Sequence, residues 1–273
     1  MLASLALPWP FDREYMQLAL LAGVVVGGTA PLIGTFLVQK RLSLLGDGLG
    51  HLAFAGVAAG IAFDVWPVWT ALIASVAGAV AIEWLRTRGH AAGDLALALF
   101  FYSGIAAGVV ITGLAGSLDA STLRYLFGSI LTVEASDALT IAILGAVVVA
   151  VVVVVWRALL AIVVDEEAAR VAGFPVDGLN LLLAAMAAVT IVTGMRVVGL
   201  LLVAALMVLP VGAAQRVASS FRSTLVVASA IGAGSAVAGL AAARQWALAP
   251  GATIVLVAAG SFLATAVVAQ VRR

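Results

Sequence analysis

Cysteine is absent from this 273-residue chain, and lysine occurs only once, at position 40. The lack of cysteine excludes disulfides, thiolate metal ligands and cysteine nucleophiles. Any metal chemistry must therefore use His, Asp, Glu or backbone oxygen, which suit hard and borderline divalent ions better than Cu(I). Lys40 follows Gln39 rather than a glycine-rich loop, which excludes ATP hydrolysis at a Walker-type phosphate site. The HExxH and GxSxG motifs are missing too, so we do not expect an enzyme.

Charge is equally scarce, because 10% of the residues are charged whereas 64% are hydrophobic. A soluble domain carries about 25% charged residues. The excess apolar surface predicts an all-α, multi-pass membrane protein in which residues 1–273 form a single transmembrane domain surrounded by lipid. The net charge is +1 and there is no basic tract, so no nucleic-acid partner is expected.

Nine stretches approach the roughly 20 apolar residues that a membrane-spanning helix needs. The second and sixth are short, which leaves eight spans as the alternative. In residues 1–16, Trp9, Phe11 and Tyr15 predict an interfacial segment. The nine predicted spans are Gln17–Val38, Gly48–Phe63, Val68–Leu85, Leu95–Leu114, Ser136–Trp156, Leu179–Gly194, Val198–Gln215, Thr224–Ala242 and Ala252–Ala269.

Positive charges predict the orientation of these spans. With nine spans, ten of the 14 Lys and Arg residues fall on one side of the membrane and four on the other. Cytoplasmic loops carry the excess of such residues. We therefore expect a cell-membrane protein, in the plasma or inner membrane, with its N-terminus outside and its C-terminus in the cytoplasm.

Asp47 and His51 interrupt the apolar sequence after Lys40, and ionisable residues in such a setting are costly. If the stretch is helical, the four-residue spacing puts both side chains on one face. An imidazole and a carboxylate together suit zinc or manganese. Two structural roles remain open: Asp47 could cap a helix, and His51 could be a neutral histidine bonded to a backbone carbonyl.

Two connections and one proline also stand out. Residues 115–135 are apolar but too short to span, which predicts a re-entrant or surface helix. Residues 158–178 hold the most charged run, which is either a solvated loop helix or a partner-binding segment. Pro210 falls inside the seventh predicted span, where it frees a backbone carbonyl and marks either a pathway hinge or a harmless kink.

Three motifs together resemble the membrane permeases of ABC-type zinc, manganese and iron importers, the ABC-3 family. They are RLSLLGDGLGHLAFAGVAAG at Arg41–Gly60, LRYLFGSIL at Leu123–Leu131, and DEEAARVAGFPVDGLN at Asp165–Asn180, continued by Arg196–Gln215. Their order and spacing match over nearly the whole chain. The GDGLGH variant is closer to the zinc-type members.

The resemblance implies a type II ABC importer permease that works as a homodimer. Two copies of a cytoplasmic ATP-binding subunit and an extracellular metal-binding protein would be its partners. The transported ion would be zinc first, then manganese or iron, with ATP on the partner subunit and no permanently bound cofactor. Asp47 and His51 would contact the metal. The residues implied in contact with the ATPase are Asp165, Glu166, Glu167, Ala168, Arg170 and Gly173.

Two other functions fit the composition. A stand-alone divalent-cation carrier or channel would need intramembrane carboxylates for proton relay, and the predicted spans are nearly bare of them. A purely structural membrane subunit would leave Asp47 and His51 without a role.

Overall fold

The computed structural model describes residues 8–87, 93–115, 120–129 and 133–271, and this part of the chain is helical without strands. His90, Arg272, Arg273 and the last two residues of the 123–131 motif lie outside the described residues. The helices are α1 (Glu14–Gln39), α2 (Leu45–Ala62), α3 (Pro67–Thr87), α4 (Gly93–Leu114), α5 (Ala120–Phe127), α6 (Ala135–Val154), α7 (Trp156–Val164), α8 (Glu166–Val171), α9 (Val176–Gly194), α10 (Leu200–Ala214), α11 (Phe221–Trp246) and α12 (Pro250–Val271).

Eight of the described helices are long and apolar enough to cross a membrane, namely α1, α2, α3, α4, α6, α9, α11 and α12. Each coincides with a predicted span. The remaining predicted span, Val198–Gln215, forms α10, which has 15 residues and is therefore about 22 Å long. It begins late because Gly199, at φ +95°, ends the irregular segment that follows α9.

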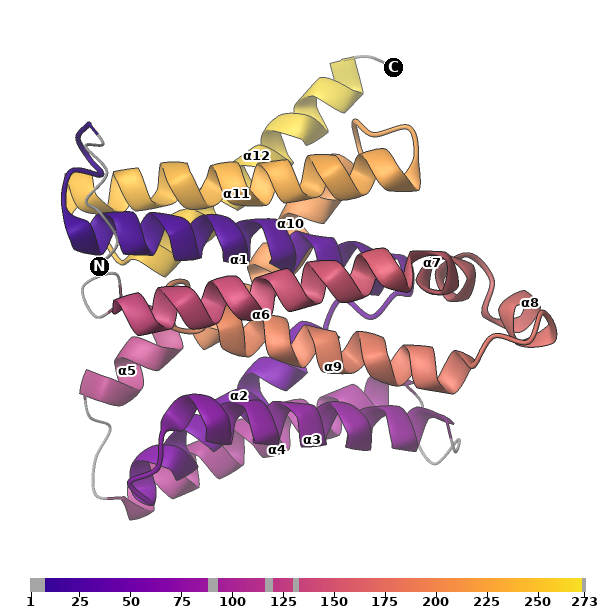
Figure 1. Ribbon diagram of the computed structural model, residues 1–273, viewed down its shortest axis with the longest axis horizontal. Helices are drawn as coiled ribbons and strands as arrows, with labels where there is room; N and C mark the ends of the chain where they lie inside the picture. Colours follow the sequence, from indigo (N-terminus) through magenta and orange to yellow (C-terminus); the bar gives the residue numbers. More distant parts are fainter. Residues whose placement is uncertain (1–7, 88–92, 116–119, 130–132, 272–273) are drawn as a thin grey trace.

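The helices lie side by side in a bundle with two distinct ends (Figure 1). At one end, α7 and α8 project beyond the bundle, and we call this the α8 end. At the opposite end lie α5 and the start of α1, and we call this the α5 end. Residues 115–135 thus contribute the short helix α5, and residues 158–178 contribute most of α7, all of α8 and the start of α9.

Close packing in the bundle depends on small residues. A Cβ atom on Gly27 of α1 would lie 2.6 Å from the carbonyl oxygen of Gly232 in α11, which leaves no room for a side chain. Several threonine hydroxyls donate to a carbonyl of their own helix; for example, Thr35 Oγ1 donates to the Pro31 carbonyl at 2.8 Å. Close contacts through small residues are typical of helices that associate in lipid.

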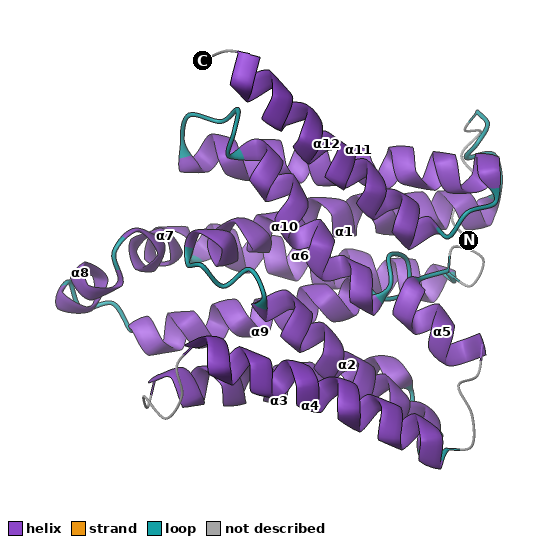
Figure 2. Ribbon diagram, turned by 180° about the vertical axis from the view of Figure 1, so that it is seen from behind, coloured by secondary structure: helices purple, strands orange, loops and turns teal. Residues whose placement is uncertain are grey.

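The shorter α2 packs against α3, α4, α9 and α10. Seen from behind, it lies between the α3–α4 pair and the remainder of the bundle (Figure 2). Gly56 of α2 meets α3 so closely that a Cβ atom there would lie 2.7 Å from the Cα atom of Ala71. Four helices therefore pack around α2, which carries both predicted metal ligands.

Candidate functional site

Asp47 and His51 lie near the start of α2, where the backbone of His51 packs against the middle of α4 at Gly104. Asp47 is in the first helical turn, and His51 follows one turn later on the same face. Both residues are half-buried, and so are Ala55 and Ala59, which continue the same line at four-residue intervals. The intervening glycines Gly46, Gly48 and Gly50 are buried. Asp47, His51, Ala55 and Ala59 therefore form a half-buried row along a mostly buried helix. We call this row the α2 stripe.

Small residues define the two borders of the α2 stripe. On the α10 side, a Cβ atom on Gly50 would lie 3.2 Å from the carbonyl oxygen of Leu200. On the α4 side, a Cβ atom on Gly104 would lie 2.9 Å from the carbonyl carbon of His51. The backbone bearing His51 is thus held at close range by α4. This contact fixes the helix positions while leaving the face with Asp47 and His51 open.

The ring of Phe101 in α4 positions the His51 imidazole. The two ring centroids are 4.4 Å apart and their planes are inclined by 74°, an edge-to-face contact. Such contacts favour one ring orientation over a free rotamer. The sequence gives no signal that singles out Phe101, because it is one apolar residue in an apolar span.

The two structural roles left open by the sequence are not found in the described part of the chain. The N-cap of α2 is Leu44, and no side chain caps the helix. Among the described residues, neither Asp47 nor His51 has a hydrogen-bond or ion-pair partner. Half-buried polar groups without protein partners are free to bind water or a ligand. No group of three potential His, Asp or Glu ligands occurs in the described residues.

The predicted inner segment forms a short helix with both ends fixed. Asp165 is the N-cap of α8, and its carboxylate accepts a hydrogen bond from the Ala168 backbone at 2.9 Å. At the other end Gly173 has φ +84°, and Phe174 N–H donates to the Ala169 carbonyl at 3.1 Å. This pattern is the glycine-terminated helix end known as the Schellman motif. Six helical residues are thereby held as one rigid element.

The side chains of α8 divide into an inward and an outward set. Glu166 faces the protein, where its carboxylate bonds to Lys40 and Asn180. Arg170 is exposed and pairs with Asp177 of α9 at 2.7 Å. Glu167 and Ala168 are exposed on the outer side of α8. Val171, the last residue of α8, is 90% exposed. Val171 was not predicted from the sequence, because a single exposed apolar residue is ordinary on a protein surface.

Pro210 is a buried residue in the interior of α10. It cannot donate to the carbonyl four residues earlier, at Leu206. A second proline, Pro31, interrupts α1 in the same way. A hinge role for Pro210 stays a prediction.

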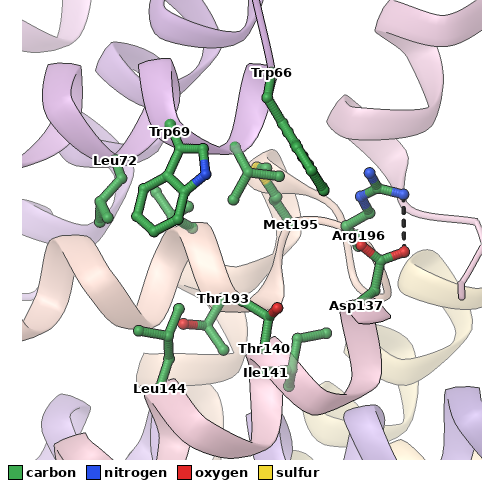
Figure 3. Close-up of a pocket in the computed structure, with 12 residues that line it drawn as sticks. Trp66, Trp69, Leu72, Asp137, Thr140, Ile141, Leu144, Thr193, Met195 and Arg196 are labelled. Atoms are coloured by element: carbon green, nitrogen blue, oxygen red, sulfur yellow. Dashed lines mark hydrogen bonds and ion pairs between the residues drawn. The ribbon is translucent and has the colours of Figure 1, made fainter. Parts of the chain in front are cut away.

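A cavity of about 200 Å³ lies at the α5 end, between α3, α6 and α9 (Figure 3). Trp66, Trp69 and aliphatic side chains form most of its wall. Its one carboxylate, Asp137, accepts a hydrogen bond from Arg196 Nη1 at 2.9 Å. Because the arginine neutralises this carboxylate and repels cations, the cavity does not suit a metal ion. The pair joins α6 to the end of α9 and was not expected from the sequence.

The sequence is similar to those of known proteins along most of its length. The model of the ABC 3 transport family matches residues 12–269. The chain is 29% identical over 250 residues to the high-affinity zinc uptake system membrane protein ZnuB of Haemophilus influenzae, covering 92% of this chain and 96% of that protein. It is 30% identical over 266 residues to the manganese import system permease protein ScaB of Streptococcus gordonii, covering 96% and 94%.

Among solved structures, the fold matches PsaBC from Streptococcus pneumoniae in complex with Fab, with a TM-score of 0.83 and 29% identity. The match covers 93% of this chain and 91% of that one. The similarity therefore extends over the whole bundle rather than over a few helices.

Proposed function

The chain belongs to the ABC 3 transport family, and from this premise we propose that it carries a divalent transition-metal ion into the cytoplasm. Zinc is the favoured ion, followed by manganese or iron, and a separate ATP-binding subunit supplies the energy. The relatives named for zinc uptake and manganese import support a metal as cargo. The similarity to zinc-type sequences in GDGLGH favours zinc.

The observation that carries this proposal is the pair of unpartnered side chains on the α2 stripe. Asp47 and His51 supply one carboxylate and one imidazole, both of which bind Zn²⁺ and Mn²⁺. A two-ligand site binds weakly, which suits a transported ion because it must leave again. In a homodimer whose axis faces the α2 stripe, two such pairs would line one pathway. The metal would then pass between the subunits.

The orientation follows from the charges of the two ends. The α8 end carries the C-terminal ends of α1 and α3 with Lys40 and Arg86, and the helices α7 and α8 with Arg157 and Arg170. We therefore propose that this end faces the cytoplasm. The α5 end would then face outward and receive metal from an extracellular binding protein. The exposed face of α8, with Glu167, Ala168 and Val171, would dock on the ATP-binding subunit.

Metal uptake in cells tests the function directly. Asp47→Ala and His51→Ala should each abolish zinc-dependent growth and radioactive zinc uptake, with the protein still present in the membrane. Glu14→Ala is the control, because it removes an exposed carboxylate from the start of α1. Uptake at the wild-type level in both site variants would remove the pair from the mechanism.

A further inference from the structure

Lys40, the only lysine of the chain, lies where α1, α7 and α8 meet. It is the C-cap of α1, and only 6% of its side chain is exposed. Its Nζ donates to Glu166 Oε2 at 2.7 Å and to the Ile162 carbonyl at 3.3 Å. A buried ammonium is strongly unfavourable unless it is paired and hydrogen-bonded, so these two bonds hold the side chain in one geometry.

The two bonds span the joint between α7 and α8. Ile162 offers one of the last carbonyls of α7, where the helix end carries partial negative charge. Glu166 is the first residue of α8, and its second oxygen accepts from Asn180 Nδ2 of α9 at 3.1 Å. Burial alone would raise the pKa of Glu166, but the bonds from Lys40 and Asn180 and the Lys40 charge lower it below its usual value. Lys40 therefore fixes how α8 sits on α7 and α9.

A second ion pair at the end of α3 completes the cluster. Arg86 Nη1 donates to Glu83 Oε2 at 2.6 Å, and the Glu83 side chain is nearly buried. The charge of Arg86 also acts on Glu166, and that of Lys40 acts on Glu83. Two cations and two anions thus form a neutral group from α1, α3 and α8. Removal of one member would leave an opposite charge unbalanced.

The turn after Lys40 connects this cluster to α2, the helix that contains Asp47 and His51. Arg41 has φ +58°, its N–H donates to the Val38 carbonyl at 3.0 Å, and Leu42 N–H donates to the Leu37 carbonyl at 2.8 Å. These bonds form a Schellman motif with arginine in place of glycine, a closed and stiff corner. Leu45 then begins α2, so Asp47 follows Lys40 by only seven residues.

We propose that Lys40 is a positioning residue that links α8 to the metal-binding start of α2 through its ion pair with Glu166. This inference rests on the proposed function. When the partner ATPase displaces α8, Lys40 moves with Glu166, and the stiff corner passes that displacement to Asp47 and His51. Without the link, α8 moves while the metal ligands stay in place. ATP hydrolysis then continues without matching transport.

The test uses the full permease, reconstituted in liposomes with its ATP-binding subunit and metal-binding protein. The measured quantity is zinc transported per ATP hydrolysed. Lys40→Met should lower this ratio about tenfold, a loss within the usual range of coupling between sites, while the assembly still hydrolyses ATP. Glu166→Gln should also lower it, and Lys40→Arg should retain most of it because the cation is kept.

Asp177→Asn is the matched control. It breaks the exposed ion pair between Arg170 of α8 and Asp177 of α9, and should leave the ratio unchanged. An unchanged ratio in Lys40→Met would overturn the proposal. So would an equal loss of transport and ATP hydrolysis in stable protein, because that result indicates a purely structural role.

A distance measurement keeps this inference separate from the proposed function. The chain has no cysteine, so Ala172→Cys after α8 and Ala59→Cys in α2 give two unique spin-label sites. Without metal or ATP, Lys40→Met should broaden the distance distribution between the labels, and Asp177→Asn should not. A wild-type width in Lys40→Met refutes the link even if zinc transport is confirmed. If Lys40→Met broadens the distance distribution but the wild-type permease transports no zinc, the link stands and the transport proposal is refuted.

Discussion

Gly104 of α4 should be essential for placing the proposed metal ligands, Asp47 and His51, although it is not itself a ligand. A Cβ atom there would lie 2.9 Å from both the His51 carbonyl carbon and the Leu52 nitrogen, where ordinary contacts begin at 3.4 Å. In Gly104→Ala, α4 and α2 must therefore separate by about 0.5 Å, because both obstructing atoms belong to the backbone. Phe101, one turn earlier on α4, would move away from the His51 ring with it.

The free energy of this change can be bounded. Alanine is a better helix former than glycine by about 1 kcal/mol. Overpacking of a close contact costs about 1–3 kcal/mol. The net loss of stability should thus be about 0–2 kcal/mol, small enough for the protein to fold. The loss of transport should be larger, since a displacement of this size disturbs a site that depends on geometry.

Gly113→Ala is the control on the same helix, because a Cβ atom there meets nothing within 4 Å. We expect it to leave both the thermal unfolding temperature and zinc uptake unchanged or slightly raised. Uptake is measured in cells, at equal protein level, alongside unfolding of the purified variants in detergent. Equal uptake by Gly104→Ala and Gly113→Ala would refute the reasoning about this contact.

Three further predictions concern α4 and α8. Phe101→Ala and Phe101→Leu should both reduce zinc uptake, because each removes the aromatic contact that orients the His51 ring. Wild-type uptake in both variants would exclude an orienting role for Phe101. Val171→Asp should abolish co-purification of the ATP-binding subunit, whereas Val65→Asp, an exposed valine at the α5 end, should not; equal recovery would exclude α8 as the docking surface. Since the pKa of Glu166 is lowered in the folded protein, its charged form stabilises the fold above the ordinary value of 4.5, and this contribution is lost as the pH falls through the lowered pKa. Glu166→Gln should accordingly be less stable than the wild type at neutral pH, and the gap in unfolding temperature should close below pH 4.5; a gap that is constant with pH contradicts the ion pair.

The helical framework could be predicted because each span is a local property of the sequence. A run of about 20 apolar residues specifies a spanning helix without reference to its neighbours. The ends of α8 are likewise set by nearby residues, since Asp165 caps the helix and Gly173 ends it. Asp47 and His51 were found because charge is rare in this chain. Each of these features depends on residues close together in the sequence.

The contacts that organise the site join residues far apart in the sequence, and no periodicity predicts them. Lys40 and Glu166 are separated by 126 positions, and Arg196 and Asp137 by 59. The resemblance implied that Glu166 contacts the ATPase, but its carboxylate faces inward to Lys40. Residue type alone showed that Glu166 was charged, whereas only the packing of α1 against α7 and α8 showed which partner it binds. Contact between Glu166 and the ATPase remains a proposal, and the structure adds a hydrogen bond from Lys40 to the Glu166 carboxylate.

Zinc accumulation in liposomes shows whether the chain is the conduit of an ATPase-driven importer. The wild-type permease should concentrate zinc only when its ATP-binding subunit, metal-binding protein and ATP are all supplied, and Asp47→Asn in the same assembly should not concentrate it. If the permease alone builds a zinc gradient, or if Asp47→Asn matches the wild type, then the chain is not an ATPase-driven conduit with its metal site on α2.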